Sequence, residues 1–135
     1  MYPLVHIALS LIFTLILKLF SIFTLNQLVI IFLSSFLVDI DHWFVYVSKT
    51  GKLGVIGSYK WFISLEKLKK KPKFLFVFHT IEFFLILILL GTKYQIFQFI
   101  LMGALFHMFL DIADSIVKKE YWKYLSIIYW ILKKH

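Results

Sequence analysis

The chain has 135 residues, of which 61% are hydrophobic and only 16% are charged. A soluble domain usually has an apolar share of about half, so a soluble core of this size could not enclose so much apolar surface. There is no cysteine, which excludes disulfide bonds and thiolate metal ligands. The formal net charge is +8 and every basic residue is lysine, which favours anionic lipid or nucleic acid as a partner.

Two apolar segments near the N-terminus are each long enough to cross a bilayer. They run over about 3–23 and 25–47, and a short polar break at 24–27 separates them. A hydrocarbon layer roughly 30 Å thick requires about 20 apolar residues. The first segment lacks the basic start and the small-residue cleavage site of a secretory signal, so we expect it to be retained. The two segments together predict a tight helical hairpin.

A hydrophilic segment with three glycines and eight of the lysines follows over 48–73. In its second half, aromatic and leucine side chains recur at helical spacing against lysines and a glutamate. We therefore expect an interfacial loop that contains an amphipathic surface helix, and we expect this helix to end at Pro72.

Two further spans are predicted over about 74–90 and 95–113, with a turn after Gly91 between them. The tail over 118–135 has too short an apolar run to cross a bilayer, and its tyrosines and tryptophans are typical of a lipid–water boundary. We expect this interfacial tail to lie flat. The predicted fold is all-α: a polytopic membrane helix bundle of four transmembrane helices with interfacial amphipathic helices, forming one integral membrane domain over 1–135.

Four spans place both termini and the loop over 48–73 on one side of the membrane. That side carries nearly all the lysines outside the spans, and the positive-inside rule makes it cytoplasmic. Because these lysines adjoin apolar spans, they favour membrane lipids as partners and argue against nucleic acid. We therefore predict an integral protein of the cell (inner) membrane with both termini in the cytoplasm.

Eight carboxylate or imidazole side chains fall within the predicted spans. A charged side chain at the bilayer centre costs about 2.5 to 3.5 kcal/mol, so these groups require compensating partners. At a rise of about 1.5 Å per residue, all eight come to the cytoplasmic third of the bundle and are contributed by four helices. They are His6, Asp39, Asp41, His42, His79, Glu82, His107 and Asp111.

The spacing of these residues adds a second constraint. In each of the last two spans the two members are three or four residues apart, so each pair shares one helical face. Asp39 and Asp41 lie about 200° apart on an ideal helix, so both can point inward only if the helix is distorted there. One of them can then orient a histidine instead of binding metal. The pattern predicts a divalent metal site.

Structural alternatives exist for parts of the set. His6 alone can be a hydrogen-bonded packing residue. The segment 39–42 can be a polar cluster at a helix end that reaches interfacial water, and His107 with Asp111 can be a simple interhelical pair. None of these alternatives accounts for all eight residues together.

Four motifs occur in an order and spacing that match a known family. They are His6 followed by Ser10, Asp39-Ile-Asp41-His42, His79-Thr80-Ile81-Glu82, and His107-Met-Phe-Leu-Asp111. Over roughly 1–115 the chain thereby resembles the membrane-bound metal-dependent hydrolases. That family is distantly similar to zinc-dependent phospholipases C and related zinc nucleases. The resemblance implies zinc binding and phosphoester hydrolysis.

The leading hypothesis is a membrane-embedded hydrolase with one to three divalent ions, zinc or similar, held by the eight residues. The metal activates a water molecule, and Asp39 or Asp41 is the candidate catalytic base. The expected substrate is a phosphoester of a lipid or another amphiphile. Two alternatives remain: a proton or metal-ion transporter, because intramembrane acids and histidines often mark ion pathways, and a noncatalytic scaffold whose metal only staples the helices.

Overall fold

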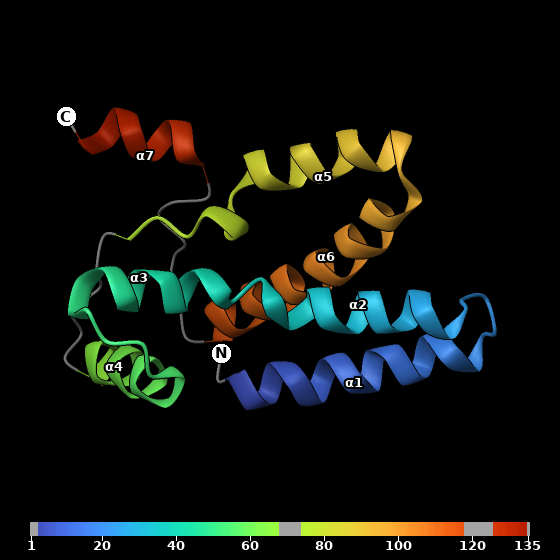
Figure 1. Cartoon of the computed structure of the whole chain (residues 1–135), viewed down its shortest axis with the longest axis horizontal. Coiled ribbons are helices and arrows are strands. Elements are labelled where there is room, and N and C mark those ends of the chain that lie inside the picture. Colours follow the sequence, from blue (N-terminus) through green and yellow to red (C-terminus); the bar gives the residue numbers. More distant parts are fainter. Residues whose placement is uncertain (1–2, 68–73, 118–125, 135) are drawn as a thin grey trace.

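A computed structural model describes residues 3–67, 74–117 and 126–134, and these residues form helices joined by turns and short extended stretches (Figure 1). The all-α prediction is confirmed for this part of the chain. In chain order the elements are α1 (Pro3–Leu19), α2 (Leu25–Leu37), α3 (Ile40–Thr50), α4 (Val55–Lys67), the 3-10 helix η1 (Val77–His79), α5 (Ile81–Lys93), α6 (Gln95–Val117) and α7 (Ile127–Lys134).

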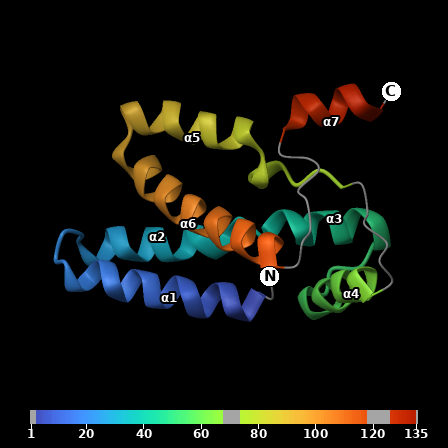
Figure 2. The ribbon, with the colours of Figure 1, turned by 180° about the vertical axis from the view of Figure 1, so that it is seen from behind.

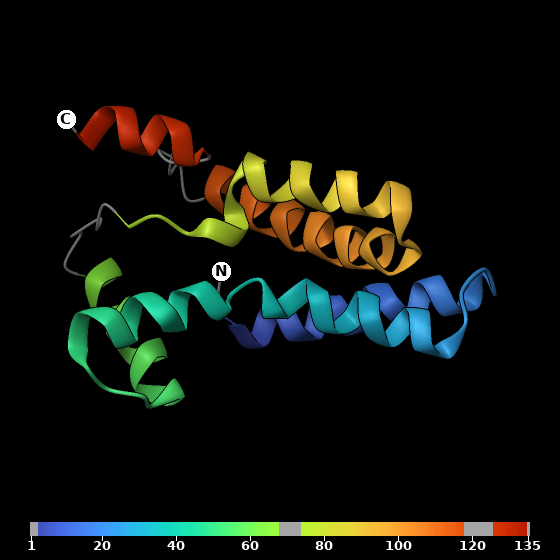
Figure 3. The same ribbon diagram turned by 45° about the horizontal axis from the view of Figure 1, so that its top comes forward.

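Two antiparallel hairpins, α1–α2 and α5–α6, form the body of the structure in two layers (Figure 3). Seen from behind, α6 lies between α5 and the α1–α2 hairpin (Figure 2), and it contacts all three of these helices. The turn of the first hairpin lies at 20–24, so the predicted polar break at 24–27 coincides with the end of this turn and the start of α2. There the Thr24 hydroxyl accepts a hydrogen bond from the Gln27 N–H, and the Gln27 side chain accepts one from the Thr24 N–H, so the two residues cap α2 reciprocally.

The predicted span over 25–47 is divided into α2 and α3 by a local break at Val38 and Asp39. Asp39 has ψ −2° instead of a helical value near −42°. Two backbone hydrogen bonds beside it join residues three positions apart instead of the four of an α-helix. The N–H of Asp39 donates to the Phe36 carbonyl, and the N–H of His42 donates to the Asp39 carbonyl. This tightened turn is the distortion that Asp39 and Asp41 require in order to point to the same side.

The predicted span over 74–90 begins later than expected. Phe76 is extended, η1 follows, and α5 starts only at Ile81. Thr80 sets this start because its hydroxyl accepts the N–H of Phe83 and its backbone is extended, as in an N-cap. Helix α5 has 13 residues, which span about 20 Å. The expectation that His79 lies on the same α-helix as Glu82 is therefore wrong.

Helices α2 and α6 cross at close range where Gly103 faces α2. A Cβ atom at Gly103 would collide with the Ile31 carbonyl oxygen and the Ser34 hydroxyl, so only glycine fits this crossing. Beside it, the fully buried Ala104 belongs to the apolar core. Small residues at such a crossing let two backbones approach closely. The crossing brings the next turn of α6 within reach of the α2 backbone.

Helix α4 is the described part of the surface helix predicted within 48–73, and it runs across the direction of α3 (Figure 3). Residues 68–73, which include the predicted helix end at Pro72, lie outside the described residues. Helix α7 belongs to the predicted tail over 118–135, of which 118–125 and 135 are likewise not described. Its axis is roughly parallel to that of α5, and its chain runs in the opposite direction (Figure 1). The flat orientation expected for the tail stays a prediction.

Two helices of the described chain are long and apolar enough to span a membrane. They are the continuous α2–α3 segment, Leu25–Thr50, with 26 residues, and α6, Gln95–Val117, with 23. Helix α1 is apolar but shorter over Leu4–Leu19, and α5 is shorter still. In the most apolar part of each long helix, only 28% of the residues are buried within the protein. Most of their apolar surface therefore faces outward.

Candidate metal centre

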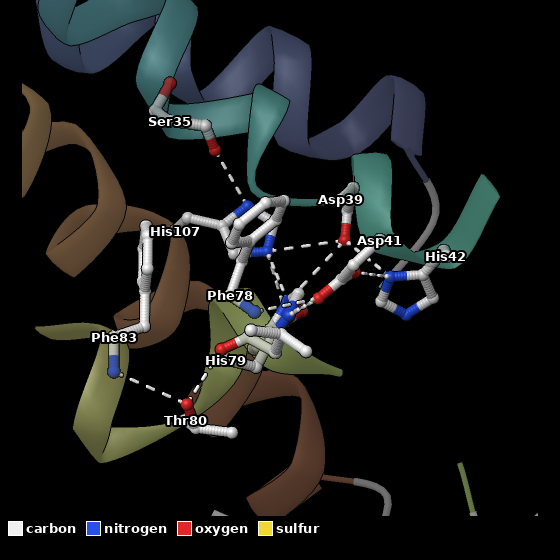
Figure 4. Close-up of polar contacts among 11 residues, drawn as sticks. Ser35, Asp39, Asp41, His42, Phe78, His79, Thr80, Phe83 and His107 are labelled. Atoms are coloured by element: carbon white, nitrogen blue, oxygen red, sulfur yellow. Dashed lines mark hydrogen bonds and ion pairs between the residues drawn. The ribbon is translucent and has the colours of Figure 1, made fainter. Parts of the chain in front are cut away.

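Seven of the eight predicted residues lie together, where α6 passes the break between α2 and α3 (Figure 4). Asp39 comes from the break, Asp41 and His42 come from α3, and His79 comes from η1. His6 comes from α1, and His107 and Asp111 come from α6. Residues from α1, the α2–α3 break, α3, η1 and α6 thus meet at one place, whereas the sequence predicted contributions from four continuous helices. The seven residues are His6, Asp39, Asp41, His42, His79, His107 and Asp111.

Four of these side chains, Asp39, His79, His107 and Asp111, each direct one ligand atom to a common region and are called the tetrad below. Their ligand atoms all lie within 4.8 Å of one another. The two Nε2 atoms are 3.2 Å apart, and they lie 3.5 and 3.2 Å from the Oδ2 atom of Asp111. The edge of a tetrahedron with metal–ligand bonds of 2.0 to 2.1 Å is about 3.4 Å. The tetrad has the spacing of four ligands around one ion.

In His79 and His107, the hydrogen bond made by the outer nitrogen, Nδ1, determines whether the inner nitrogen, Nε2, carries a proton in the neutral ring. Nδ1 of His107 lies 2.7 Å from the Ser35 carbonyl oxygen, to which it can only donate. Nδ1 of His79 lies 3.0 Å from the Asp41 carboxylate and donates to it in the same way. In the neutral rings both Nε2 atoms are therefore unprotonated, and their lone pairs face each other at 3.2 Å. A cation between them turns this repulsion into binding.

Asp41 orients other residues instead of facing the tetrad. One carboxylate oxygen accepts from Nδ1 of His42 at 2.9 Å. The other accepts from Nδ1 of His79 at 3.0 Å and from the backbone N–H of Phe78 at 3.2 Å. A carboxylate on the outer nitrogen of a metal-binding histidine is the common arrangement around zinc. Of the two aspartates proposed as ligand or base, Asp41 thus accepts hydrogen bonds that orient His42 and His79, and Asp39 belongs to the tetrad.

His6 lies behind Asp111 and outside the tetrad. Its Nε2 atom is 3.0 Å from Oδ1 of Asp111, whose Oδ2 faces the tetrad histidines. The His6 ring also stacks on the His107 ring, with centroids 4.3 Å apart. The structure therefore places His6, expected as a metal ligand, where it holds a ligand in position. Its Nδ1 atom and the nearby Ser10 hydroxyl are buried and have no hydrogen-bond partner among the described residues.

His42 stands at the outer edge of the cluster. With Asp41 and His79 it forms a second group of ligand atoms within 4.8 Å. Its contact with Asp41, at 2.9 Å, has the length of a hydrogen bond and is shorter than the distance of about 3.4 Å expected between two zinc ligands. The His42 ring stacks on Phe76 at 4.0 Å. The distances therefore favour one ion in the tetrad over two or three ions.

Glu82 does not join the cluster, and its prediction as a metal ligand is corrected. Its carboxylate accepts hydrogen bonds from the Ser126 hydroxyl at 2.5 Å and from the N–H groups of Ile127 and Ile128 at 3.1 and 3.3 Å. Glu82 therefore holds the first turn of α7, where free N–H groups favour an anion. The physical reason is the late start of α5, which separates Glu82 from the face of His79.

The cluster is buried except along one edge. The side chains of His79 and His107 are 2% and 0% exposed, and that of Asp111 is 10% exposed. Asp39 and His42 are 25% and 32% exposed. The exposed edge of the cluster is therefore the one formed by Asp39 and His42.

Two contributors were not predicted from the sequence. The Ser35 carbonyl, which orients His107, is a backbone group and has no signature of its own in the sequence. Gly103 lets α6 approach α2 closely enough for that contact. A signal for it was present, because Gly103-Ala104 on one helix and Ser34-Ser35 on the other are small residues within otherwise bulky apolar segments.

Comparisons of the chain with protein-family models, with curated proteins and with solved structures gave no match. The resemblance to membrane-bound metal-dependent hydrolases therefore stays a prediction based on four motifs. The tetrad is described independently of that resemblance, by the distances between its atoms and by its burial.

Proposed function

We propose that this protein is a membrane-embedded metal-dependent hydrolase whose single divalent ion lies within the tetrad, bound by His79, His107 and Asp111 and faced by Asp39. The observation that carries the proposal is the pair of histidine Nε2 atoms 3.2 Å apart, with two carboxylates at the same point. A single proton between the rings bridges the two nitrogens but balances only one of the two carboxylate charges. A divalent cation satisfies both rings and balances both carboxylates.

Zinc is the ion that this donor set favours. The donors at the site are two imidazole nitrogens and two carboxylate oxygens, the separations of the nitrogens from one another and from Asp111 are close to a tetrahedral edge, and the chain offers no thiolate. Each tetrad histidine also has a hydrogen-bond acceptor on its outer nitrogen. Such partners fix the tautomer and raise the basicity of a ligand.

A zinc ion at this place would supply an acidified water molecule for hydrolysis. Catalytic zinc sites commonly have three protein ligands, and His79, His107 and Asp111 are the three most deeply buried members of the tetrad. Asp39 lies at the exposed edge, 3.5 and 3.7 Å from the two Nε2 atoms. We assign Asp39 as the group that accepts a proton from a molecule entering there.

The same geometry favours a second candidate, a noncatalytic scaffold. If Asp39 binds the ion permanently, four protein ligands close the coordination shell, as in structural zinc sites. The ion would then staple α2, α6 and η1 together without turnover. The transporter alternative has less support, because a pathway requires polar groups through the whole thickness of the membrane. The described cluster is confined to one end of the α1–α2 hairpin.

The membrane location and the substrate class belong to this proposal. Large apolar side chains cover the outward faces of α1 and α5, for example Leu15 at 52% and Leu89 at 69% exposure. Such a surface fits lipid, with α1 and α5 added to the two long helices as four spans and both termini in the cytoplasm. A site near one end of those spans would meet the headgroup layer, so we propose a phosphoester of a lipid or another amphiphile as substrate.

The proposal is tested by elemental analysis of the purified full chain together with assays on phospholipid and soluble phosphoesters. We expect one zinc per chain, with turnover that stops on chelation and returns with zinc. One zinc per chain without turnover on any phosphoester would support the scaffold. A chain that lacks stoichiometric metal and hydrolyses its substrate equally well in chelator would overturn the metal centre.

A further inference from the structure

The outer face of α4 and the loop before it expose large apolar side chains. Leu53 is 69% exposed, Val55 73% and Ile56 72%. These three residues belong to the segment that leads from α3 into the first turn of α4, and Figure 1 shows this segment at the lower edge of the molecule. Exposed apolar residues gathered in this way on a protein surface usually mark an interaction site. We call Leu53, Val55 and Ile56 the α4 tip.

The inner face of α4 is firmly packed, so the exposure of the tip is not due to a loose helix. Gly57 faces the hydroxyl of Tyr46 so closely that a Cβ atom there would come within 2.6 Å of it. Ser58 is buried, and the Trp61 ring lies 5.8 Å from the Tyr46 ring. The loop is held as well, since the Trp43 indole N–H donates to the Leu53 carbonyl at 3.0 Å. The tip is therefore displayed on a fixed support.

The charges around the α4 tip are of one sign. Lys49, Lys52 and Lys60 are exposed and lie near it in the chain, and the nearest acidic residues in the sequence are Asp41 and, at the far end of α4, Glu66. Exposed apolar side chains among lysines, with no acid, are the pattern of helices that lie in an anionic lipid surface. A protein partner would have to present an acidic, apolar groove, for which nothing here argues.

The orientation of α4 agrees with this pattern. Helix α4 runs across the direction of α2 and α3 (Figure 3), so it lies parallel to the membrane plane if α2 and α3 cross the membrane. On its inner face, Phe62 contacts the His42 ring edge to face, with centroids 5.2 Å apart. Because His42 stands at the exposed edge of the metal centre, a membrane surface on the tip would lie close to that edge.

We propose that the α4 tip docks into a layer of anionic phospholipid headgroups and holds the exposed edge of the metal centre against that layer. Leu53, Val55 and Ile56 enter the boundary between headgroups and acyl chains, and Lys49, Lys52 and Lys60 bind the lipid phosphates. The inference rests on the membrane location in the proposed function, but it does not require the metal or turnover.

The natural absence of cysteine provides a direct test. The full-length I56C variant, labelled with an environment-sensitive fluorophore, is placed in nanodiscs of phosphatidylcholine alone or mixed with phosphatidylglycerol. We expect emission at shorter wavelength, and stronger quenching by lipid-attached quenchers, in the anionic discs. A lysine near an anionic surface contributes about fivefold to binding. K52Q with K60Q should therefore lower the equilibrium constant between docked and water-exposed label in the anionic discs by about 25-fold. K18Q, at the far end of α1, should leave it unchanged.

Two outcomes would overturn the docking proposal. One is a label equally exposed to water in both kinds of disc. The other is a label that becomes shielded only as protein concentration rises in detergent, which would identify a second copy of the chain as the occupant. The H107A variant with the same label separates the two proposals. It should lose zinc yet keep the lipid dependence of its emission, so a failure of the metal centre and a failure of docking give different results.

Discussion

The tetrad and the Asp41–His42 pair use the same residue types within one cluster but at different spacings. In the tetrad with both rings neutral, the two Nε2 atoms are acceptors that lie 3.2 Å from each other and 3.2 to 3.7 Å from carboxylate oxygens. In the pair, a ring N–H and a carboxylate oxygen lie 2.9 Å apart, and one donates to the other. The difference teaches that proximity alone does not define a metal site. Facing acceptors imply a cation, whereas a donor and an acceptor satisfy each other.

The largest effect is expected from removing a tetrad histidine. H107A removes one Nε2 ligand, and zinc affinity should fall by more than the roughly 100-fold upper range known for loss of an orienting partner. H42A, which removes a histidine of the outer pair, should leave one zinc per chain. Elemental analysis with competitive chelator titration measures both. Equal zinc loss in the two variants would erase the distinction between tetrad and pair.

The next effect concerns the orientation of His79. D41N keeps the size of the side chain but weakens the acceptor on Nδ1 of His79, which is 3.0 Å away. Zinc affinity should fall by about 10- to 100-fold, with the stoichiometry at saturating zinc unchanged. Titration with zinc in the presence of a buffering chelator measures the shift. If D41N bound less than one zinc per chain even at saturating zinc, Asp41 would be a metal ligand, and the assignment of a single ion to the tetrad would be contradicted.

A smaller effect tests the helix crossing that supports the tetrad. G103A forces α2 and α6 apart at the Ile31 carbonyl, and overpacking of this kind costs about 1 to 3 kcal/mol of stability. It should also weaken zinc binding, because His107 is withdrawn from the Ser35 carbonyl. G54A is the matched control, since a Cβ atom there meets nothing closer than 3.9 Å. Thermal unfolding in detergent compares the two; equal stabilities would contradict the close crossing.

The smallest effect on the metal is expected at Glu82. E82Q weakens the anion that holds the start of α7, as the loss of a helix cap does, and so loosens the first turn of that helix. Hydrogen exchange at the amides of Ile127 and Ile128 should speed up, while zinc affinity stays that of the natural chain. A fall in zinc affinity like that of D41N would return Glu82 to the metal centre.

Most of the cluster could be predicted because its members combine an unfavourable location with regular spacing. Carboxylates and histidines within apolar segments need partners, and a shared depth on several helices limits where those partners are. The division of roles could not be predicted, since it depends on ring orientations. Whether His6 faces the ion or the back of Asp111 is decided by the packing of α1 against α6, where His6 stacks on His107.

The start of α5 was mispredicted for a local reason. Apolar residues on both sides of Thr80 read as one hydrophobic run, although a threonine that can cap the Phe83 N–H competes with helix continuation. The consequence is large, because residues on either side of such a cap no longer share a helical face. Glu82 was assigned to the site on the assumption of an unbroken helix.

The sequence by itself determined the helical class, the first hairpin, and which carboxylates and histidines in apolar segments need polar partners. It could do so because composition, capping and hydrophobic runs are local properties. It also limited Asp39 and Asp41 to two alternatives, a distorted helix or one aspartate that orients a histidine, since two residues two apart do not share a helix face. Only the tertiary structure decided which atoms face one another. That choice depends on the close crossing at Gly103 and on the backbone acceptor at Ser35, which are set by contacts between distant segments.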